Sequence, residues 1–582
     1  MRSKIKILAL LLAIMMFLCS CDLPFGITDR DETETPSKTE TPVNTDTETE
    51  TETETETETE KATESETEES TYRQTISRSR EEVEAMLTIS DEDFTEAEAL
   101  LVEFEELALS STDVDAINAV YEAFEEKYDF IATQISIASV IYYLDMSDEE
   151  ASERYLGNYD KYGDMYNSYM AHCKKVYEES PVRDELFADW SEEDIKMLLN
   201  FSPETTALTI RNEQITDEIN NLSNAEFKNK SAELYAELVT NYNKIAKLYG
   251  YDNYYEYATK EIYGRDFGTT ELEYFSKVVA EQYLPQYGLL YTKARSSISM
   301  LTSDDKKLFD GIMYGKFDGM DRNYLLEYID SLDGSMKEGM EHIFVNRNMI
   351  FTSAKNSHPT AFQTYFDNLE MPFCLFGSEG QSTMTMVHEI GHYYSSLYNS
   401  TLISYDLAEV QSQGNEMLML NYLKSNVYPS VYKAAKNYQL YSCMSTIVAS
   451  VIIDEFERAV YSRESVEGFG SEEFDAIMSE VCDKFGGEAY VREEVGDVFN
   501  YWRQVATNNP VYYISYAVSA TAAIRIYAEL EVDAEAGREM YRAVVEDVSE
   551  DDTFLTALAK AGISSPFTDE STEKIIATVW GN

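Results

Sequence analysis

The chain has 582 residues, of which 44% are hydrophobic, so it can bury more apolar surface than an ordinary single domain. Tyrosine is abundant, with 44 residues, whereas 24 glycines and 11 prolines are too few for a turn-rich β protein. The formal net charge of −62 argues against a protein that binds nucleic acid or an anionic lipid surface through a basic face.

The N-terminus predicts an export signal with a lipidation site. Residues 1–20 begin with basic side chains and continue as an apolar run, Ile7 to Leu18, too short for a comfortable membrane span. The run ends in Leu-Cys-Ser-Cys, which resembles a bacterial lipobox, so 1–20 is the expected signal peptide and Cys21 the lipidated residue. We expect a protein anchored by lipid to the extracellular face of a bacterial membrane. The alternative is ordinary secretory cleavage nearby, which would give a secreted protein.

We expect residues 21–72 to hold the lipidation site and a disordered acidic tether. A Thr-Glu repeat fills Thr47 to Glu60, and the stretch has few apolar residues to support collapse. Like charges along the tether repel one another and extend it. A domain held above the membrane surface is the expected result.

Helical periodicity begins near Ser77 and continues through most of the chain. We assign 73–200 as an N-terminal helical region and 201–582 as a second helical region that carries the motifs below. The predicted fold class is therefore mainly α. The further helices expected from apolar residues at steps of three and four span 114–145, 149–178, 192–200, 224–249, 270–299, 323–345, 431–462, 472–484 and 534–547.

The body of the chain has four cysteines, Cys173, Cys374, Cys443 and Cys482, with no C-x-x-C pattern. Cys374 and Cys443 have apolar neighbours, which predicts buried thiols. The sequence leaves one disulfide among these four cysteines possible and does not assign it.

Two of the five histidines, His388 and His392, stand four residues apart in the run His-Glu-Ile-Gly-His. On a helix they share one face and can reach one metal ion, and Glu389 projects to the side where it can meet a water bound to that metal. This is the H-E-x-x-H arrangement of zinc hydrolases. It predicts a metallopeptidase with Glu389 as general base; the competing interpretation is a helix with two incidental histidines.

The flanks of the motif predict a buried helix, because Met, Val, Ile and Leu residues are spread around it. Gly391 costs up to about 1 kcal/mol in a helix interior, which indicates that another backbone or the substrate comes close there. Upstream, Pro372–Phe376 has the character of a short strand. That strand is either an edge that pairs with a bound peptide or simply part of the core.

A catalytic zinc requires three protein ligands and one open position. No histidine follows His392, so a downstream third ligand must be a carboxylate. The run that begins at Asp406 predicts a second helix that is nearly uncharged apart from Glu409 and Glu416, seven residues apart and hence on one face. We expect Glu409 to be the ligand, with Asp406 as the local competitor, and Glu416 to orient a ligand histidine.

These motifs carry a family resemblance. His388-Glu-Ile-Gly-His, then Glu409 with Glu416, then the tyrosine-rich run 510–520 resemble, in that order, oligoendopeptidase F and its relatives in the thimet oligopeptidase family. The resemblance implies a two-lobed helical metallopeptidase with a deep channel that takes oligopeptide substrates. It also implies one Zn²⁺ per chain, held by His388, His392 and Glu409, and Tyr513 and Tyr516 as donors to the oxyanion. We expect the protein to be a monomer.

The sequence departs from the family in two places. The gap from His392 to Glu409 is shorter than usual, and residues 502–510 lack the family's downstream histidine. Arg503 and Asn508 are the next candidates for an oxyanion donor there. The alternative function is therefore a catalytically impaired, zinc-containing lipoprotein that binds peptides, although a pure binder has no need of Glu389 between its ligands.

Overall fold

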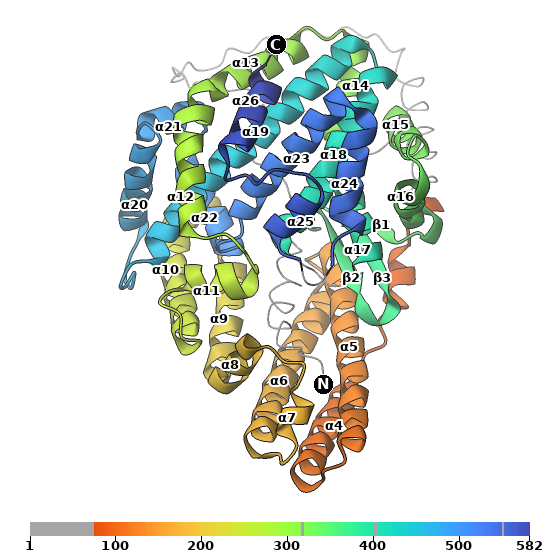
Figure 1. Cartoon of the computed structure of the whole chain (residues 1–582), viewed down its shortest axis with the longest axis vertical. Coiled ribbons are helices and arrows are strands. Elements are labelled where there is room, and N and C mark those ends of the chain that lie inside the picture. Colours follow the sequence, from red (N-terminus) through yellow and green to blue (C-terminus); the bar gives the residue numbers. More distant parts are fainter. Residues whose placement is uncertain (1–74, 221, 316–318, 400–403, 550–551, 582) are drawn as a thin grey trace, which may run out of the picture.

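A computed structural model of the chain describes residues 75–581, apart from residues 221, 316–318, 400–403 and 550–551 (Figure 1). The predicted signal peptide, Cys21 and the acidic tether lie outside these residues. Within the described part, helices predominate and one small sheet is present, which confirms the mainly α fold class. None of the described helices combines the length and the apolar character that a membrane crossing requires.

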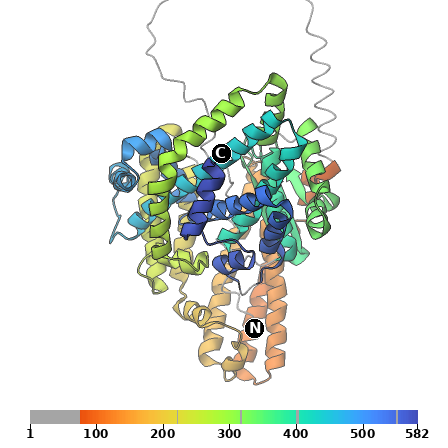
Figure 2. The same ribbon diagram turned by 45° about the horizontal axis from the view of Figure 1, so that its top comes forward.

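The N-terminal helices form a bundle that projects from the larger body in both views (Figures 1 and 2). Its long helices begin at capping aspartates: Asp113 accepts the Ala116 amide and Asp148 accepts the Ala151 amide, each at 3.1 Å. Buried tyrosines and phenylalanines fill the interior between the helices. The long helices of the bundle are α4 (Asp91–Ser110), α5 (Val114–Leu144) and α6 (Glu149–Glu179); the short helix α3 (Arg80–Glu84) precedes them and packs beside α5 and the sheet.

The middle of the chain continues in shorter helices, and two of the predicted long helices are divided. The expected helix 270–299 is interrupted by a π-turn, η2 (Val279–Tyr283), just before Pro285, which has no amide hydrogen to continue the helical ladder. The expected helix 323–345 breaks before Gly334, which adopts φ +53°. The elements of this part are α7 (Arg183–Leu186), α8 (Glu192–Asn200), α9 (Pro203–Asn220), α10 (Asn224–Leu248), α11 (Tyr254–Tyr257), η1 (Ala258–Ile262), α12 (Thr269–Val278), η2, α13 (Leu284–Ser299), α14 (Ser303–Tyr314), α15 (Gly319–Asp330) and α16 (Gly334–Asn346).

A three-stranded sheet lies between α5 and the helix that carries the histidines. β3 (Met371–Phe376) is its central strand, with β1 (Met349–Phe351) parallel on one side and β2 (Ala361–Phe366) antiparallel on the other; the short 3₁₀ turn η3 (Asp367–Leu369) joins β2 to β3. The prediction of a strand at 372–376 is confirmed, but the interpretation of it as a free edge is wrong. Both of its edges are already paired, because β1 and β2 add to it from elsewhere in the chain.

The larger body is built around helices from the C-terminal half. α17 (Thr383–Tyr398) packs on α18 (Tyr405–Asn426), which packs on α23 (Ile514–Val532), and α23 also contacts α19 (Pro429–Tyr461). Most side chains of α18 and α23 are buried, so these two helices form the centre of the core. The remaining helices are α20 (Ser471–Lys484), α21 (Glu488–Glu494), α22 (Val498–Asn508), α24 (Ala534–Glu546), α25 (Phe554–Lys560) and α26 (Asp569–Trp580).

The four cysteines of the body, Cys173, Cys374, Cys443 and Cys482, are free and buried. The prediction of buried thiols at Cys374 and Cys443 is confirmed. The predicted division at residue 200 falls between α8 and α9, and it stays a prediction.

Candidate metal centre

Helix α17 places both histidines inside the protein. It begins at Ser382, whose hydroxyl accepts the Thr385 amide at 3.0 Å. The rings of His388 and His392 lie 5.0 Å apart, centroid to centroid, as expected for successive turns on one face. Burial lowers the pKa of His392 to about 4, so at neutral pH its ring nitrogen keeps the lone pair that a metal requires.

Helix α18 crosses α17 at Gly391. A Cβ atom built on this glycine would lie 2.6 Å from the carbonyl oxygen of Gln411 and 2.8 Å from Cα of Ser412, both main-chain atoms of α18. Only a residue without a side chain permits this approach. The prediction that another backbone comes close at Gly391 is therefore confirmed, and the crossing brings Glu409 up to the histidines.

Glu409 lies next to both ring nitrogens. Its Oε2 atom is 3.6 Å from Nε2 of His388 and 3.8 Å from Nε2 of His392, and the three donor atoms all lie within 4.8 Å of one another. Although burial opposes ionisation, a hydrogen bond with His388 and the charges of the two imidazoles lower the pKa of Glu409 to about 2. The group thus offers two imidazole nitrogens and one ionised carboxylate around a single point.

Asp406, the competitor for the third position, is engaged elsewhere. Its carboxylate is fully buried and lies 3.3 Å from Nε of Arg265, and that guanidinium also donates to the hydroxyl of Ser515 at 2.9 Å. A buried charge pair of this kind is costly to break because each partner neutralises the other. The geometry therefore favours Glu409 over Asp406.

Glu416 contacts the first histidine from behind. Its Oε1 atom lies 2.5 Å from Nδ1 of His388, and its Oε2 atom accepts a hydrogen bond from the side-chain amide of Gln439 on α19. A carboxylate on Nδ1 fixes the imidazole tautomer in which Nε2 carries the free lone pair and faces Glu409. The expected orienting contact of Glu416 is present in the structure, whereas Gln439 gave no signal in the sequence.

Glu389 is buried on the same turn of α17 as His388, with 3% of its surface exposed. The adjacent main chain is held by the sheet, because the thiol of Cys374 on β3 lies 3.9 Å from the carbonyl oxygen of Glu389. The role of Glu389 as a base beside the metal stays a prediction from the H-E-x-x-H spacing.

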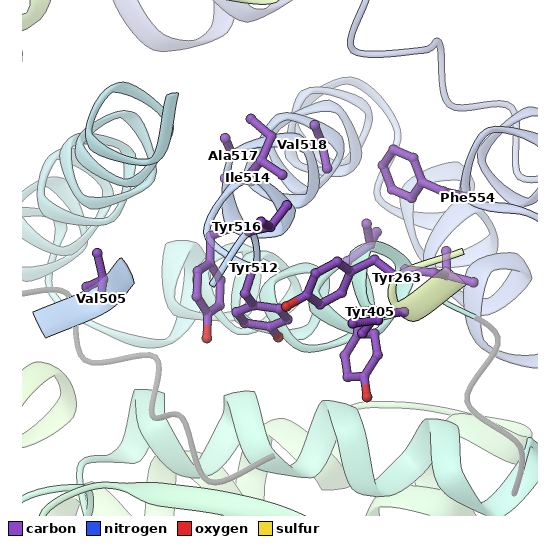
Figure 3. Packing of buried hydrophobic residues seen from close by; sticks show 14 of the residues in the cluster. Tyr263, Tyr405, Val505, Tyr512, Ile514, Tyr516, Ala517, Val518 and Phe554 are labelled. Carbon is purple, nitrogen blue, oxygen red and sulfur yellow. The ribbon is translucent and has the colours of Figure 1, made fainter. Parts of the chain in front are cut away.

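The tyrosine-rich run lies beside this centre, and one of its members was missed. Tyr512 donates its hydroxyl to Oε1 of Glu409 at 2.8 Å. Tyr516 stands four residues later, its ring 5.1 Å from that of Tyr512, and Figure 3 shows the two side by side. Tyr512 lies in the turn before α23, so helical spacing gave no signal for it; its place in the tyrosine-rich run was the only sequence clue.

Tyr513 and Arg503, the other candidate oxyanion donors, make packing and structural contacts. The half-buried ring of Tyr513 packs between those of Tyr501, at 5.7 Å, and Tyr516, at 5.4 Å. Arg503 is fully buried, pairs with Asp475 at 2.7 Å and donates to main-chain carbonyl oxygens of Phe499 and Lys228. Arg503 is thus occupied by structural contacts, which argues against it as the oxyanion donor.

Comparison with known proteins bears on the same region. Residues 336–574 match the sequence profile of peptidase family M3. The matched segment contains His388, Glu389, His392, Glu409 and the tyrosine-rich run. Over this segment the chain is therefore similar to peptidase family M3. No curated protein matches its sequence.

Solved structures show that the chain shares the overall fold of several oligopeptidase structures. A Bacillus anthracis str. Ames protein assigned as an oligoendopeptidase F superimposes with a TM-score of 0.64 at 16% identity. PZ peptidase A with inhibitor 2 gives 0.61 at 16%, and oligoendopeptidase-F from Enterococcus faecium gives 0.51 at 15%. Each comparison covers 84% of this chain and 96% of the other chain. The likeness therefore extends through the N-terminal helices, well beyond the segment that the profile matches.

Proposed function

We propose that the protein is a zinc-dependent endopeptidase that hydrolyses oligopeptides with Glu389 as general base. The observation that carries the proposal is the convergence of His388, His392 and Glu409 within 4.8 Å, on the helix pair that also holds Glu389. Two imidazoles and one carboxylate are a typical protein set for catalytic zinc, and they leave one coordination position for water or substrate. The donor set therefore fits one Zn²⁺ per chain.

Zinc bound by these three residues would lower the pKa of a water toward neutrality and polarise the scissile carbonyl. Glu389 would take the proton of the attacking water and pass it to the leaving amine. Glu416 would hold His388 in the ligating tautomer, and Tyr512 would hold the carboxylate of Glu409 in place.

Tyr516 and Tyr513 are the proposed donors to the oxyanion. Tyr516 is almost fully buried beside Tyr512, whose hydroxyl contacts Glu409, which supports its placement at the reacting carbonyl. Such a donor contributes about 3–4 kcal/mol to transition-state stabilisation in comparable sites. Tyr513 would act as the second donor or support Tyr516 through ring contact.

Replacing Glu389 tests the central assignment. Glu389→Gln keeps the shape of the side chain but removes the base, so zinc content should stay near one per chain while hydrolysis of quenched peptides is lost. Glu103→Gln, which removes an exposed carboxylate from α4, is the control for the change in charge. If Glu389→Gln retained most of the activity, the general-base role would be wrong.

The alternative, a zinc-containing peptide-binding lipoprotein, is favoured by the histidine missing from residues 502–510. A turnover assay with peptides of several lengths, with and without a chelator, separates the two functions. Chelator-sensitive turnover that falls off for long peptides supports an oligopeptidase with an enclosed channel. Tight peptide binding without turnover supports the alternative.

We also propose that the protein is a monomer anchored by a lipid on Cys21 at the extracellular face of a bacterial membrane. The support is the lipobox-like end of residues 1–20, followed directly by the acidic tether. Cys21→Ser should move the protein from the membrane fraction to the soluble fraction. A wild-type protein that is wholly soluble, with a mature N-terminus other than residue 21, would point to secretion instead.

A further inference from the structure

Near its start, the tyrosine-rich run contains a valine in a main-chain conformation that valine disfavours. Val511 joins α22 to α23 with φ +65°, in the left-handed region. There the side chain of a β-branched residue crowds its own backbone, so such a residue is a genuine outlier. Val511 is fully buried and stands next to Tyr512. Surrounding contacts must impose this conformation, because the local chain would not choose it.

Two buried side chains from distant helices supply those contacts. The Val511 amide donates to Oε1 of Glu457, near the C-terminal end of α19, at 2.7 Å. The hydroxyl of Tyr263 donates to the carbonyl oxygen of Pro510 at 2.7 Å. The amide and the carbonyl belong to neighbouring residues, so Glu457 and Tyr263 hold the chain immediately before Tyr512.

The two contacts continue into the candidate metal centre. The ring of Tyr263 lies 5.9 Å from that of Tyr512, and the ring of Tyr405, next to Asp406, lies 5.8 Å from Tyr512. Figure 3 shows Tyr263, Tyr405, Tyr512 and Tyr516 gathered at the start of α23. A change in the main chain at Val511 would therefore move the hydroxyl that contacts Glu409 and the start of the helix that carries Tyr516.

We propose that Glu457 is a positioning residue of the peptidase: by binding the Val511 amide it holds the left-handed turn that directs Tyr512 to Glu409 and sets the place of Tyr516. Tyr263 assists from the other side of the turn. Only the consequence for catalysis rests on the proposed function, since the contact with the Val511 amide exists without metal or substrate.

The surroundings of Glu457 agree with this role. Its side chain is 1% exposed, and a buried carboxyl group is costly unless it makes specific hydrogen bonds. Burial, with the nearby Asp454 carboxylate, raises the pKa of Glu457 well above its usual range, although the Val511 amide and Arg265 oppose the shift. The uncharged form that this favours resembles glutamine, which keeps an oxygen acceptor at the same position.

The test compares Glu457→Leu, which removes the acceptor, with Glu457→Gln, which keeps it. Glu455→Leu is the matched control, because Glu455 is a buried acid of the same helix that pairs with Arg458 and Lys484 instead. Hydrogen exchange of the main chain at residues 505–516, in metal-free protein, reports the turn directly. Zinc affinity and the separate values of kcat and KM report its consequences.

In Glu457→Leu we expect exchange in this segment to become at least about tenfold faster, because the Val511 amide loses its partner. We expect zinc affinity to fall about tenfold through Tyr512, and kcat to fall up to about 100-fold with KM within about twofold of wild type. Glu457→Gln should restore all three, and Glu455→Leu should alter none of them even where it lowers the melting temperature.

Unchanged exchange in Glu457→Leu, or an equal loss in Glu457→Gln, would overturn the assignment. If Glu457→Leu fails to fold, Tyr263→Phe takes its place, with smaller changes in the same direction expected and no change counting against the proposal. A wild-type protein without zinc or turnover would refute the proposed function but leave the exchange measurement as a valid test of the turn.

Discussion

Replacing Gly391 with alanine tests whether the close crossing of α17 and α18 assembles the metal centre. The added Cβ would lie 2.6 Å from the Gln411 carbonyl oxygen, whereas ordinary contact begins at 3.4 Å. The helices must therefore separate locally by about 0.8 Å, the difference between the two values. The atoms in the way are main-chain atoms, so no flexible side chain can yield instead.

The cost follows from two opposing effects. Overpacking against a rigid neighbour costs about 1–3 kcal/mol, and the contact with main chain places Gly391 at the upper end. Alanine regains about 1 kcal/mol of helix propensity. We expect a net loss of about 2 kcal/mol in the free energy of unfolding.

The same displacement should weaken the metal centre. Ser412, whose Cα is 2.8 Å from the added Cβ, donates its hydroxyl to Oε2 of Glu409 at 3.1 Å, so the two residues move together. A shift near 1 Å in such a group lowers activity by up to about 100-fold. Denaturant unfolding, zinc competition with a chelator and peptide turnover measure the three effects.

Gly157→Ala is the matched control. Gly157 lies within α6 and nothing stands within 4 Å of its added Cβ, so this variant should gain up to about 1 kcal/mol and keep wild-type zinc affinity. If Gly391→Ala were as stable, as active and as tightly zinc-binding as the wild type, the crossing would not be what brings Glu409 to the histidines.

Five further variants probe individual side chains. Glu409→Ala should abolish zinc binding as measured by metal analysis. Asp406→Ala should mainly lower stability, because it leaves the buried Arg265 without its carboxylate partner. Equal zinc content in the two variants would show that Glu409 is not a ligand. Glu416→Ala should weaken zinc affinity by about 10–100-fold in a chelator competition, and an unchanged affinity would refute the orienting role. Tyr512→Phe should weaken zinc affinity and have a smaller effect on kcat, because it removes the hydrogen bond to Glu409. Tyr516→Phe should lower kcat by about 10²–10³ with little change in KM. If kcat/KM of Tyr516→Phe stayed within about twofold of wild type, that tyrosine would be a packing residue.

The sequence alone determined the features that depend on local spacing. The i, i+4 histidines, the base between them and the uncharged helix with two acids seven residues apart follow from helical periodicity. Gly391 correctly indicated a close backbone contact, because glycine inside a helix lowers stability and therefore suggests that a larger side chain would not fit. The mainly α fold class followed from the same periodicity over the whole chain.

Only the tertiary structure decided which groups meet across the chain. It favoured Glu409 over Asp406 as the third metal ligand, because the carboxylate of Asp406 pairs with Arg265, which is distant in the sequence. It placed β3 in the centre of a sheet, because β1 and β2 pair with it from both sides. It also showed the hydrogen bond from Tyr512 to Glu409 and the one from the Val511 amide to Glu457, which precedes Val511 by 54 positions. Periodicity shows which face of a helix a residue occupies. The residue that it contacts from another element depends on how the helices cross, and a single sequence does not show those crossings directly.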